Sequence, residues 1–297
     1  MRVLLTGATG FLGSHLTRAL LEAGHEVIIL KRSFSNTSRI SELLHYVTVY
    51  DLDRCELEQP FLDFPRIDSI VHTATCYGRE GQGASEVLET NLVMPLKLLE
   101  AAVSFNTGSF FNTGSFANKA NPIYGPLSFY SLSKGQFEVW CKMYGDEQKI
   151  RVVNVRLEHM YGPRDAEFKF LNYVINGCLK NTGELALTPG QQKRDFIYID
   201  DIVSAYMTLL VETQTHSVGW RQYELGSGKA ISIREFVETV KMITRSKTKL
   251  LFGALPYSVG EIMHSKADIK PLELLGWSCK TDLEQGIRNT LKLSPRN

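Results

Sequence analysis

A glycine-rich turn near the amino terminus constrains the fold of this chain more than any other feature. Gly7, Gly10 and Gly13 recur every third residue, between a short apolar strand at residues 2–6 and a helix-patterned segment at residues 11–23. A turn of this kind leaves backbone amides facing outward at the positive end of a helix dipole, where a pyrophosphate binds. A strand before the turn and an amphipathic helix after it are the context that such a site requires. We therefore expect a dinucleotide here, held by Gly7, Gly10, Phe11, Leu12 and Gly13.

Apolar strands and helical segments alternate along the first half of the chain. The patterning predicts strands at residues 2–6, 26–31, 47–50, 69–72, 109–112 and 152–156 and helices at residues 11–23, 85–103, 129–147, 199–212, 233–244 and 283–293. Strands without polar alternation, separated by helices, indicate an α/β fold with a doubly wound parallel sheet of the Rossmann type. Segments become shorter after about residue 160, with Gly and Pro breaks. We expect a dinucleotide-binding domain at residues 1–160 that also carries the catalytic residues, and a smaller mixed substrate domain at residues 161–297. This division allows the chain to cross back once between them.

Composition and charge exclude several classes of function. The net charge is +1, and no basic block or stripe points to nucleic acid. No apolar run is long enough for a bilayer, and the amino terminus lacks the pattern of a secretory signal. The five cysteines are scattered without a Cys-x-x-Cys pair, which favours a reduced, cytoplasmic setting. No His, Cys or Asp spacing indicates a metal site.

The end of the second predicted strand bears on which dinucleotide is bound. An enzyme that binds NAD usually has Asp or Glu here, which contacts the ribose 2′-hydroxyl. This chain has Lys31 and Arg32 instead. A carboxylate would repel a 2′-phosphate, whereas these cations would pair with one, so NADP(H) is expected ahead of NAD. Two solvated surface cations are the alternative. Asp51 and Leu52, after the third strand, are placed to touch the adenine, although a simple turn aspartate is also common there.

A tyrosine and a lysine lie one helical turn apart farther along the chain. Tyr130 and Lys134 have the i, i+4 spacing that puts both on one helix face. An ammonium near a phenol favours the phenolate, so Tyr130 is expected to exchange a proton near neutral pH. Ser115 follows the strand at residues 109–112 and is placed to orient a substrate oxygen. Tyr–Lys pairs at this spacing are frequent by chance. This pair indicates an active site because it follows, in order along the chain, the glycine turn, the alternating strands and Ser115.

These motifs together resemble the extended short-chain dehydrogenase/reductases, the NAD-dependent epimerase/dehydratase family, in the branch that acts on nucleotide sugars. The resemblance covers nearly the whole chain. It rests on the glycine turn at residues 6–13, Val71-His72-Thr73-Ala74, Thr90-Asn91-Leu92, Thr113-Gly114-Ser115, Tyr130 to Lys134, the segment 156–163 and the segment 194–201.

The resemblance implies roles for individual residues. Tyr130 would be the acid/base, Lys134 would bind the nicotinamide ribose and tune Tyr130, and Ser115 would orient the reacting oxygen. Thr73 and Ala74 would line the cofactor cleft, and Asn91, beside the active site, would also bind the cofactor. Arg194 would meet the sugar-nucleotide diphosphate, the alternative being an ion pair with Asp200 or Asp201. His159 would form part of the substrate wall, the alternative being a packed histidine.

Departures from the family pattern narrow the reaction. Ser115-Phe116-Ala117 replaces the acidic pair that 4,6-dehydratases place after the catalytic hydroxyl, which disfavours elimination of water. Lys31 and Arg32 suit a reductase that consumes NADPH better than an epimerase that keeps NAD bound. The loop from Ser115 to Tyr130 is short for this branch, and its segment at residues 118–127 is expected to pass near the sugar.

The stretch Leu157-Glu158-His159-Met160-Tyr161-Gly162-Pro163 resembles reductases of the CDP-abequose and paratose synthase type, which complete CDP-linked 3,6-dideoxyhexoses of bacterial surface polysaccharide. It implies reduction of a 4-keto group on a nucleotide-linked deoxyhexose. Three alternatives remain: an NAD-retaining sugar 4-epimerase, a reductase for an apolar ketone, and a redox regulator that binds NADP without chemistry.

The resemblance also implies a homodimer, paired through the helix that follows Asn91 and the helix that holds Tyr130. Four apolar side chains of the second helix are candidates for the core or for that interface, and we expect them in the core: Phe129, Phe137, Trp140 and Met143.

Overall fold

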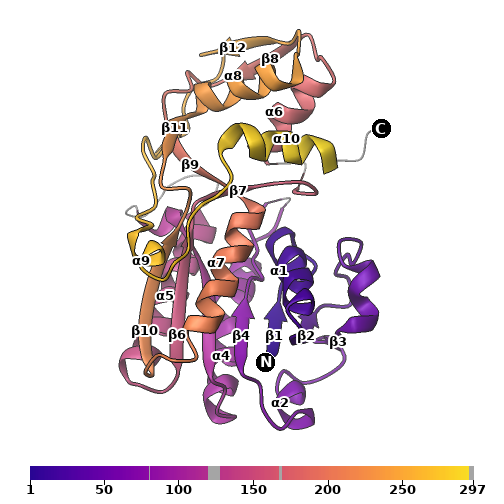
Figure 1. Ribbon diagram of the computed structural model, residues 1–297, viewed down its shortest axis with the longest axis vertical. Helices are drawn as coiled ribbons and strands as arrows, with labels where there is room; N and C mark the ends of the chain where they lie inside the picture. The colour runs from indigo at the N-terminus through magenta and orange to yellow at the C-terminus, as the bar shows by residue number, and fades with distance from the viewer. Residues whose placement is uncertain (80, 120–127, 167–168, 294–297) are drawn as a thin grey trace.

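Seven parallel strands form one central sheet, in the order β10-β6-β5-β4-β1-β2-β3 (Figure 1). The computed structural model describes residues 1–79, 81–119, 128–166 and 169–293. The strands of this sheet are β1 (Arg2–Thr6), β2 (Glu26–Lys31), β3 (Thr48–Asp51), β4 (Ser69–His72), β5 (Ser109–Ser115), β6 (Arg151–Leu157) and β10 (Gly219–Leu225). The strand order reverses between β1 and β4, which is where ligands bind in open α/β sheets. The doubly wound α/β prediction is confirmed.

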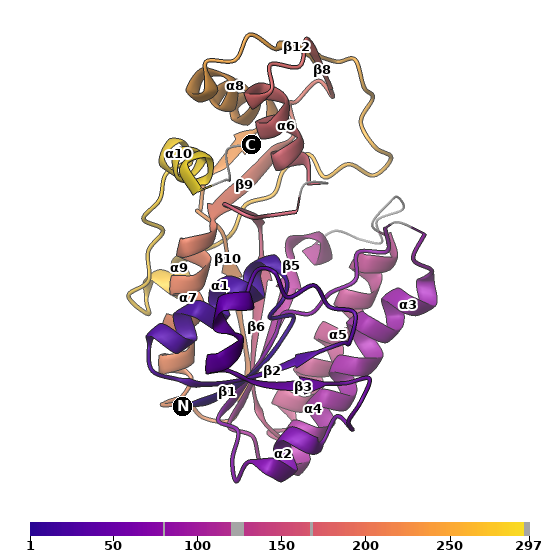
Figure 2. The ribbon, with the colours of Figure 1, turned by 90° about the vertical axis from the view of Figure 1, so that its right-hand side faces the viewer.

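Helices cover both faces of this sheet (Figure 2). Helices α1 (Phe11–Glu22) and α7 (Ile199–Glu212) lie on one face, and α4 (Met94–Ser104) and α5 (Ser128–Asp146) lie on the other. Successive residues of a strand point to opposite faces, so Val3 and Leu5 pack on the α1 side while Leu4 packs on the α5 side. Both faces are therefore apolar, which explains the strands without polar alternation. Short connectors complete this part: η1 (Ser41–Tyr46), α2 (Gln59–Asp63) and η3 (Phe116–Lys119).

The single helix expected at residues 85–103 is interrupted. It consists of α3 (Ala84–Leu88), a π-helical turn η2 (Glu89–Val93) and α4. Pro95 lies at the start of α4 and has no N–H to bond to the Asn91 carbonyl four residues earlier. The wider π turn accommodates this loss, and such turns occur often at functional sites.

The seventh strand and one covering helix come from the chain beyond residue 160. Strand β10 pairs in parallel with β6, and α7 packs beside α1. Sequence patterning missed β10 because Trp220, Arg221 and Gln222 do not form an apolar run. An edge strand needs less apolar surface than a central one. The division of the chain into folding units at residue 160 stays a prediction, since residues on both sides of it build one sheet.

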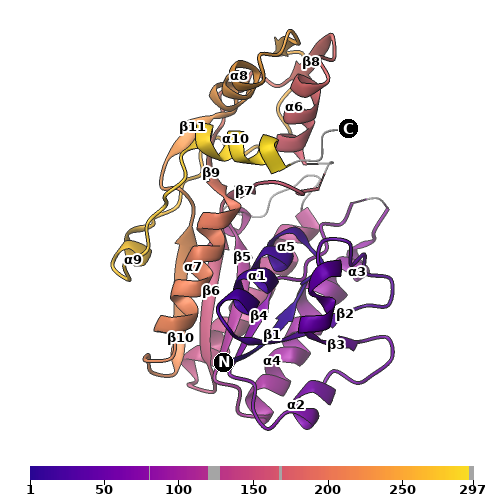
Figure 3. The same ribbon diagram turned by 45° about the vertical axis from the view of Figure 1, so that its right-hand side comes forward.

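The remaining chain forms a smaller part above the carboxyl ends of the central strands (Figures 1 and 3). A three-stranded sheet, β11-β9-β7, contains β7 (His159–Tyr161), β9 (Lys193–Tyr198) and β11 (Ala230–Ser232). A two-stranded sheet pairs β8 (Glu184–Leu187) with β12 (Lys249–Phe252). Its helices are α6 (Phe170–Leu179), α8 (Ile233–Thr244), α9 (Lys270–Glu273) and α10 (Leu283–Leu293). Within the described residues, none of the helices has both the length and the apolar character needed to cross a bilayer.

Candidate active site

The glycine turn packs so closely that two of its glycines have no room for a side chain. A Cβ on Gly7 would lie 2.6 Å from the Ala74 nitrogen, and one on Gly13 would lie 2.1 Å from the Gly7 oxygen. Gly7 also has a φ of +71°, in the left-handed region that favours glycine. Among the described residues, a Cβ on Gly10 would meet one atom within 4 Å, the Gly7 oxygen at 3.1 Å. The open side of the turn is therefore at Gly10, where a pyrophosphate can approach the backbone.

The first turn of α1 is available to an anion. Gly10 is the N-cap, no side chain caps the helix, and its first turn contains no acidic residue. Phe11 and Leu12 bury their side chains in the core, so these two residues face the turn through their backbone amides. Amides and the helix dipole both favour a phosphate here. The geometry fits the pyrophosphate of a dinucleotide.

The loop after β4 is bonded to the end of β1. The Thr73 hydroxyl donates to the Thr6 carbonyl over 2.7 Å, and the Ala74 amide donates to the Thr6 hydroxyl over 3.3 Å. Thr73 and Ala74 consequently lie against Gly7, at the point where the strand order reverses. The structure thus brings together the glycine turn and the two residues expected to line the cofactor cleft.

The two cations after β2 have carboxylate partners on the neighbouring strand. Lys31 Nζ lies 3.4 Å from Asp51 Oδ2, and Arg32 forms an ion pair with Asp53. The Leu52 amide donates to the Lys31 carbonyl over 2.9 Å, which ties the end of β3 to that of β2. Lys31, Arg32, Asp51 and Leu52 are therefore neighbours. The sequence did not reveal that the cations are paired.

The proposed proton-transfer set is buried at the carboxyl end of β5. Ser115 is the last residue of β5, and Tyr130 and Lys134 lie on the sheet-facing side of α5. All three are at least nine-tenths buried, and a hydrogen bond joins the Ser115 hydroxyl and the Tyr130 phenol. The i, i+4 spacing thus places Tyr130 and Lys134 on one buried face.

Burial governs the protonation of both α5 groups. It raises the pKa of Tyr130 above its usual 10.0, the nearby Tyr77 phenol raises it further, and the Ser115 hydrogen bond lowers it. It lowers the pKa of Lys134 from its usual 10.5 to about 8, although Cys141 and Glu138 partly oppose this. The expectation of a lowered tyrosine pKa is wrong, because desolvation of the phenolate and the Tyr77 phenol together outweigh the Ser115 hydrogen bond. Tyr130 is held protonated, the form that a proton donor needs.

Tyr77 was not found by sequence reasoning. Its ring stacks on that of Tyr130, with centroids 5.0 Å apart and an interplanar angle of 28°. Burial raises the Tyr77 pKa, the Asp165 carboxylate raises it further, and Arg79 lowers it. Tyr77 lies in the irregular loop after β4, where no periodicity marks a side chain as functional. The sequence offered one indication of its role, namely an aromatic residue shortly after Thr73 and Ala74.

Asn91 supports the site through four hydrogen bonds. In the π turn, its Nδ2 donates to the Cys76 carbonyl (2.8 Å) and to Ser133 Oγ (3.1 Å). Its Oδ1 accepts from the Cys76 amide (2.8 Å) and from the Thr75 hydroxyl (3.3 Å). Both amide protons are therefore used within the protein. Asn91 fastens the loop after β4 to α5, and this arrangement favours a positioning role over direct contact with the cofactor.

His159 and Arg194 lie in the smaller part on adjacent strands. The His159 ring packs between Phe116, at a centroid distance of 4.3 Å, and Phe196, at 5.8 Å. Phe116 directly follows Ser115, so His159 lies close to the proton-transfer set. Arg194 is buried and forms an ion pair with Glu261, not with Asp200 or Asp201. Of the short segment at 118–127, residues 120–127 lie outside the described residues.

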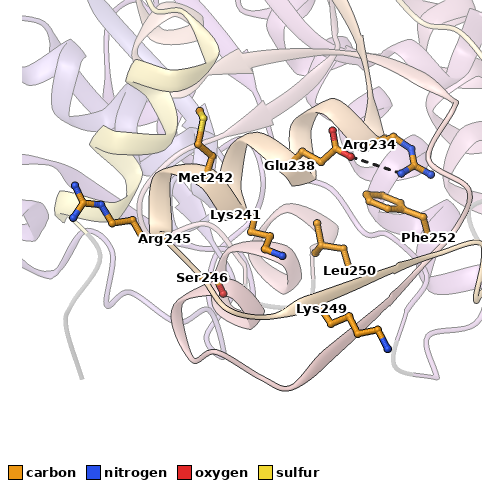
Figure 4. A pocket seen from close by; sticks show the side chains of 9 residues that line it. All are labelled: Arg234, Glu238, Lys241, Met242, Arg245, Ser246, Lys249, Leu250 and Phe252. Atoms are coloured by element: carbon orange, nitrogen blue, oxygen red, sulfur yellow. Dashed lines mark ion pairs between the residues drawn. The ribbon is translucent and has the colours of Figure 1, made fainter.

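A surface groove elsewhere shares no residue with this site (Figure 4). It lies on the smaller part between α8 and β12, and the Arg234–Glu238 ion pair of 3.6 Å is at one end. Its lining residues are Arg234, Glu238, Lys241, Met242, Arg245, Ser246, Lys249, Leu250 and Phe252. The groove is removed from the glycine turn and from the proton-transfer set.

Comparison with known proteins bears on the resemblance inferred from the motifs. The chain is 37% identical over 294 residues to CDP-abequose synthase of Salmonella muenchen, covering 98% of this chain and 97% of that protein. It is 35% identical to CDP-abequose synthase of Salmonella typhimurium strain LT2, with the same coverage.

Solved structures share the fold over the full length. UDP-glucose 4-epimerase from Thermotoga maritima with UDP-glucose has a TM-score of 0.84 at 22% identity, covering 99% of this chain and 98% of that chain. UDP-glucuronic acid 4-epimerase from Bacillus cereus, in complex with UDP-glucuronic acid and NAD, has a TM-score of 0.83 at 25% identity and the same coverage. The NAD dependent epimerase/dehydratase family itself matches residues 3–226, about three quarters of the sequence. The resemblance is confirmed, and the chain belongs to this family.

Proposed function

We propose that this protein uses NADPH to reduce the 4-keto group of a CDP-linked 4-keto-deoxyhexose. The observation that carries the proposal is the buried set of Ser115, Tyr130 and Lys134 beside an open glycine turn, in a chain 37% identical to a CDP-abequose synthase. Such a reaction belongs to the biosynthesis of deoxysugars for bacterial surface polysaccharide. We propose the cytoplasm as its location, since the five cysteines are free thiols.

The chain's own residues supply the proton and hold the substrate oxygen. When bound, NADPH supplies a hydride to the carbonyl carbon. Burial raises the pKa of Tyr130 and keeps it protonated, so we assign it as the donor of a proton to the carbonyl oxygen. The Ser115 hydroxyl, already bonded to that phenol, donates to the same oxygen as negative charge grows there. The Lys134 ammonium lowers the energy of the phenolate left behind, and it is placed to bind the nicotinamide ribose.

The remaining expected residues fit substrate and cofactor roles. Arg194 offers a guanidinium to the diphosphate, which would replace its contact with Glu261. His159, packed between two aromatic rings, forms a wall of the sugar site. Lys31 and Arg32 favour NADP(H) over NAD, because no acidic residue stands at the end of β2.

A homodimer is part of this proposal. Of the four α5 side chains expected in the core, Phe137 is fully buried, but Phe129, Trp140 and Met143 are 54%, 40% and 46% exposed. Leu132 and Val139 are also exposed on this helix. A solvent-facing apolar stripe on one helix marks an interface, and a second copy of the chain can cover it.

A 4-epimerase that keeps NAD bound is the second candidate. The Bacillus cereus relative has this activity in its name and contained NAD. Such an enzyme would purify with cofactor and need none added. A regulator without chemistry is disfavoured, because it would have no need of the buried Ser115, Tyr130 and Lys134 set.

Oxidation of NADPH with a panel of nucleotide-linked 4-keto-deoxyhexoses tests the proposal. We expect turnover with a CDP-linked 4-keto sugar, and Tyr130→Phe should lower it by about 10²- to 10⁴-fold while NADPH still binds. Interconversion of 4-hydroxyl epimers without added cofactor would establish the epimerase instead. Equal turnover in Tyr130→Phe would refute the assignment of the acid.

A further inference from the structure

The ion pairs at the end of β2 weaken the electrostatic attraction of Lys31 and Arg32 for a phosphate. Lys31 is paired with Asp51, and Arg32 is paired with Asp53. Asp51 also accepts from the Ser33 hydroxyl over 2.7 Å, and Asp53 accepts from the Ser33 amide over the same distance. A dianionic phosphate placed here meets two carboxylates as well as two cations. Local electrostatics at this position are therefore nearly balanced.

Arg39 lies in a different environment. In the described chain its guanidinium bonds to two carbonyl oxygens: Nε donates to the Arg164 carbonyl over 3.0 Å, and Nη1 reaches the Thr9 carbonyl at 3.5 Å. Thr9 belongs to the glycine turn, between Gly7 and Gly10. Carbonyl oxygens orient a guanidinium without neutralising it. Two of its five N–H groups are used, so three remain for a ligand.

The segment after β7 holds Arg39 in this position. The Arg164 side chain also bonds to the residue before Arg39: its Nη2 donates to the Ser38 carbonyl over 3.1 Å. Its φ of +66° is uncommon for a residue with a side chain, and such strain concentrates at functional sites. The next residue, Asp165, is occupied by Lys169, whose Nζ lies 2.8 Å from Asp165 Oδ1. Burial raises the pKa of Asp165, and the charges of Lys169 and Arg39 both lower it, but in the described residues no ion pair joins Arg39 to this carboxylate.

Positive charge accumulates around this point. His15, one turn into α1, has a pKa lowered to about 4, chiefly by burial; the Pro163 backbone bond raises it, and the Arg164, Arg18 and Arg39 charges lower it further. The Lys169 ammonium lies over the Phe11 ring, 5.3 Å from its centroid. Lys169 and Arg18 are paired with Asp165 and Glu42, so Arg39 and Arg164 are the cations that border the glycine turn without an ion pair in the described residues.

We propose that Arg39, held by the carbonyl oxygens of Thr9 and Arg164, is the principal anchor for the 2′-phosphate of NADPH. The inference rests on the proposed use of NADPH and names the residue that discriminates it from NADH. The loop after β2 faces the ribose hydroxyls of a bound dinucleotide. A planar guanidinium with three free donors binds a phosphate in a bidentate manner, which a paired lysine cannot do. Lys31 and Arg32 make the smaller contribution, because they must first leave Asp51 and Asp53.

Nucleotide binding to the full chain, without any sugar, tests this assignment. Dissociation constants for NADPH, NADH, 2′,5′-ADP and 5′-AMP are measured by calorimetry for the wild type and for Arg39→Gln, Arg32→Gln and Arg54→Gln. Arg54 is a matched control, since its side chain is 79% exposed and its contact with Asp51 is 3.8 Å. We expect Arg39→Gln to weaken NADPH and 2′,5′-ADP at least about tenfold, as loss of a charged phosphate contact does, with NADH and 5′-AMP unchanged. Arg32→Gln should have a smaller effect, and Arg54→Gln should have none.

Two outcomes overturn the assignment of Arg39 and leave the proposed function intact. In the first, Arg39→Gln still prefers NADPH to NADH as the wild type does. In the second, Arg39→Gln binds NADPH and NADH equally more weakly, which would assign Arg39 to the pyrophosphate. A wild type that binds NADPH no tighter than NADH overturns the proposed cofactor as well. Should Arg39→Gln unfold, Arg39→Lys keeps the charge without the planar fork. It should still lose NADPH affinity relative to NADH.

Discussion

The ring of Tyr77 stacks on the ring of Tyr130, with their centroids 5.0 Å apart. The contact joins the loop after β4 to α5, and it covers the phenol to which we assign proton transfer. Burial raises the pKa of Tyr130, and the Tyr77 phenol raises it further, so both keep Tyr130 protonated. The hydrogen bonds of Asn91 to Thr75 and Cys76 hold the same loop, so the position of Tyr77 depends on the π turn.

Replacing Tyr77 separates the effect of its ring from that of its hydroxyl. Tyr77→Phe keeps the stack, and we expect kcat to stay within about threefold of the wild type. Tyr77→Ala removes it and should lower kcat about fivefold, since an aromatic pair contributes about 1 kcal/mol beyond its area. Steady-state kinetics on both variants provide the measurement. A larger loss in the Phe variant than expected would instead assign the Tyr77 hydroxyl to the substrate.

The burial of Lys134 predicts a pH dependence of stability. Its pKa is about 8 in the folded protein and 10.5 when exposed, so between these values the unfolded chain binds more protons. The free energy of unfolding must then rise with pH across this window, and below it the buried charge costs about 3 kcal/mol. Lys134→Met should therefore be more stable than the wild type near pH 7, with the difference shrinking toward pH 10.

Urea unfolding of Lys134→Met and the wild type at about pH 7 and about pH 9.5 measures this difference. Lys142→Met, at an exposed position of α5, is the control and should change stability equally at both pH values. A gap for Lys134→Met that stays constant, or that widens with pH, would contradict the assigned direction.

Comparing Gly7 with Gly24 separates the cost of a left-handed backbone conformation from the cost of steric crowding around an added Cβ. Gly7 and Gly24 have φ values of +71° and +74°, but a Cβ meets backbone at 2.6 Å in the first and nothing within 4 Å in the second. Gly24→Ala should cost about 1 kcal/mol of stability from its left-handed conformation alone. Gly7→Ala should cost at least about 2 kcal/mol more, since backbone atoms must move. Denaturant unfolding compares them, and equal costs would show that the turn is not tightly packed.

Asn91 should be more important for stability than its polar character suggests. Asn91→Asp replaces the side-chain amide, whose two N–H groups donate hydrogen bonds, by a carboxylate. A carboxylate oxygen would then face the Cys76 carbonyl oxygen in a fully buried site. We expect a loss of about 3 kcal/mol. Asn172→Asp, which loses one bond to the Ala166 carbonyl at a partly buried position, should lose about 1 kcal/mol. A similar small effect for both substitutions would argue against a positioning role for Asn91.

The exposed apolar stripe of α5 predicts the oligomeric state. The wild type should sediment as a dimer, and Val139→Glu should shift it toward monomer because a charge would be buried in the interface. Leu274→Glu provides the control, since Leu274 is 87% exposed and lies away from α5. A monomeric wild type, or a dimer unchanged by Val139→Glu, would place the interface elsewhere.

Much of the fold could be predicted because it depends on local patterns. The strands β1, β2 and β4 were placed at their observed bounds, since fully buried parallel strands are continuous apolar runs. Helices α7 and α8 were placed as accurately, because apolar spacing and their end signals are local. Strand β10 and the π turn were not predicted. Strand β10 lies at the edge of the sheet, where a strand need not be an apolar run, and the π turn accommodates the missing N–H of Pro95.

By itself the sequence determined the glycine turn, the parallel sheet and the helix face shared by Tyr130 and Lys134, because each follows from spacing along one segment. Only the tertiary structure decided which charges are neutralised. Lys31 and Arg32 meet Asp51 and Asp53, while Arg39 meets the carbonyls of Thr9 and Arg164. These partners come from the end of β3 and the turn after it, from the glycine turn, and from the segment after β7. Long-range contacts also bury Tyr130, and desolvation rather than sequence neighbours therefore sets its acidity.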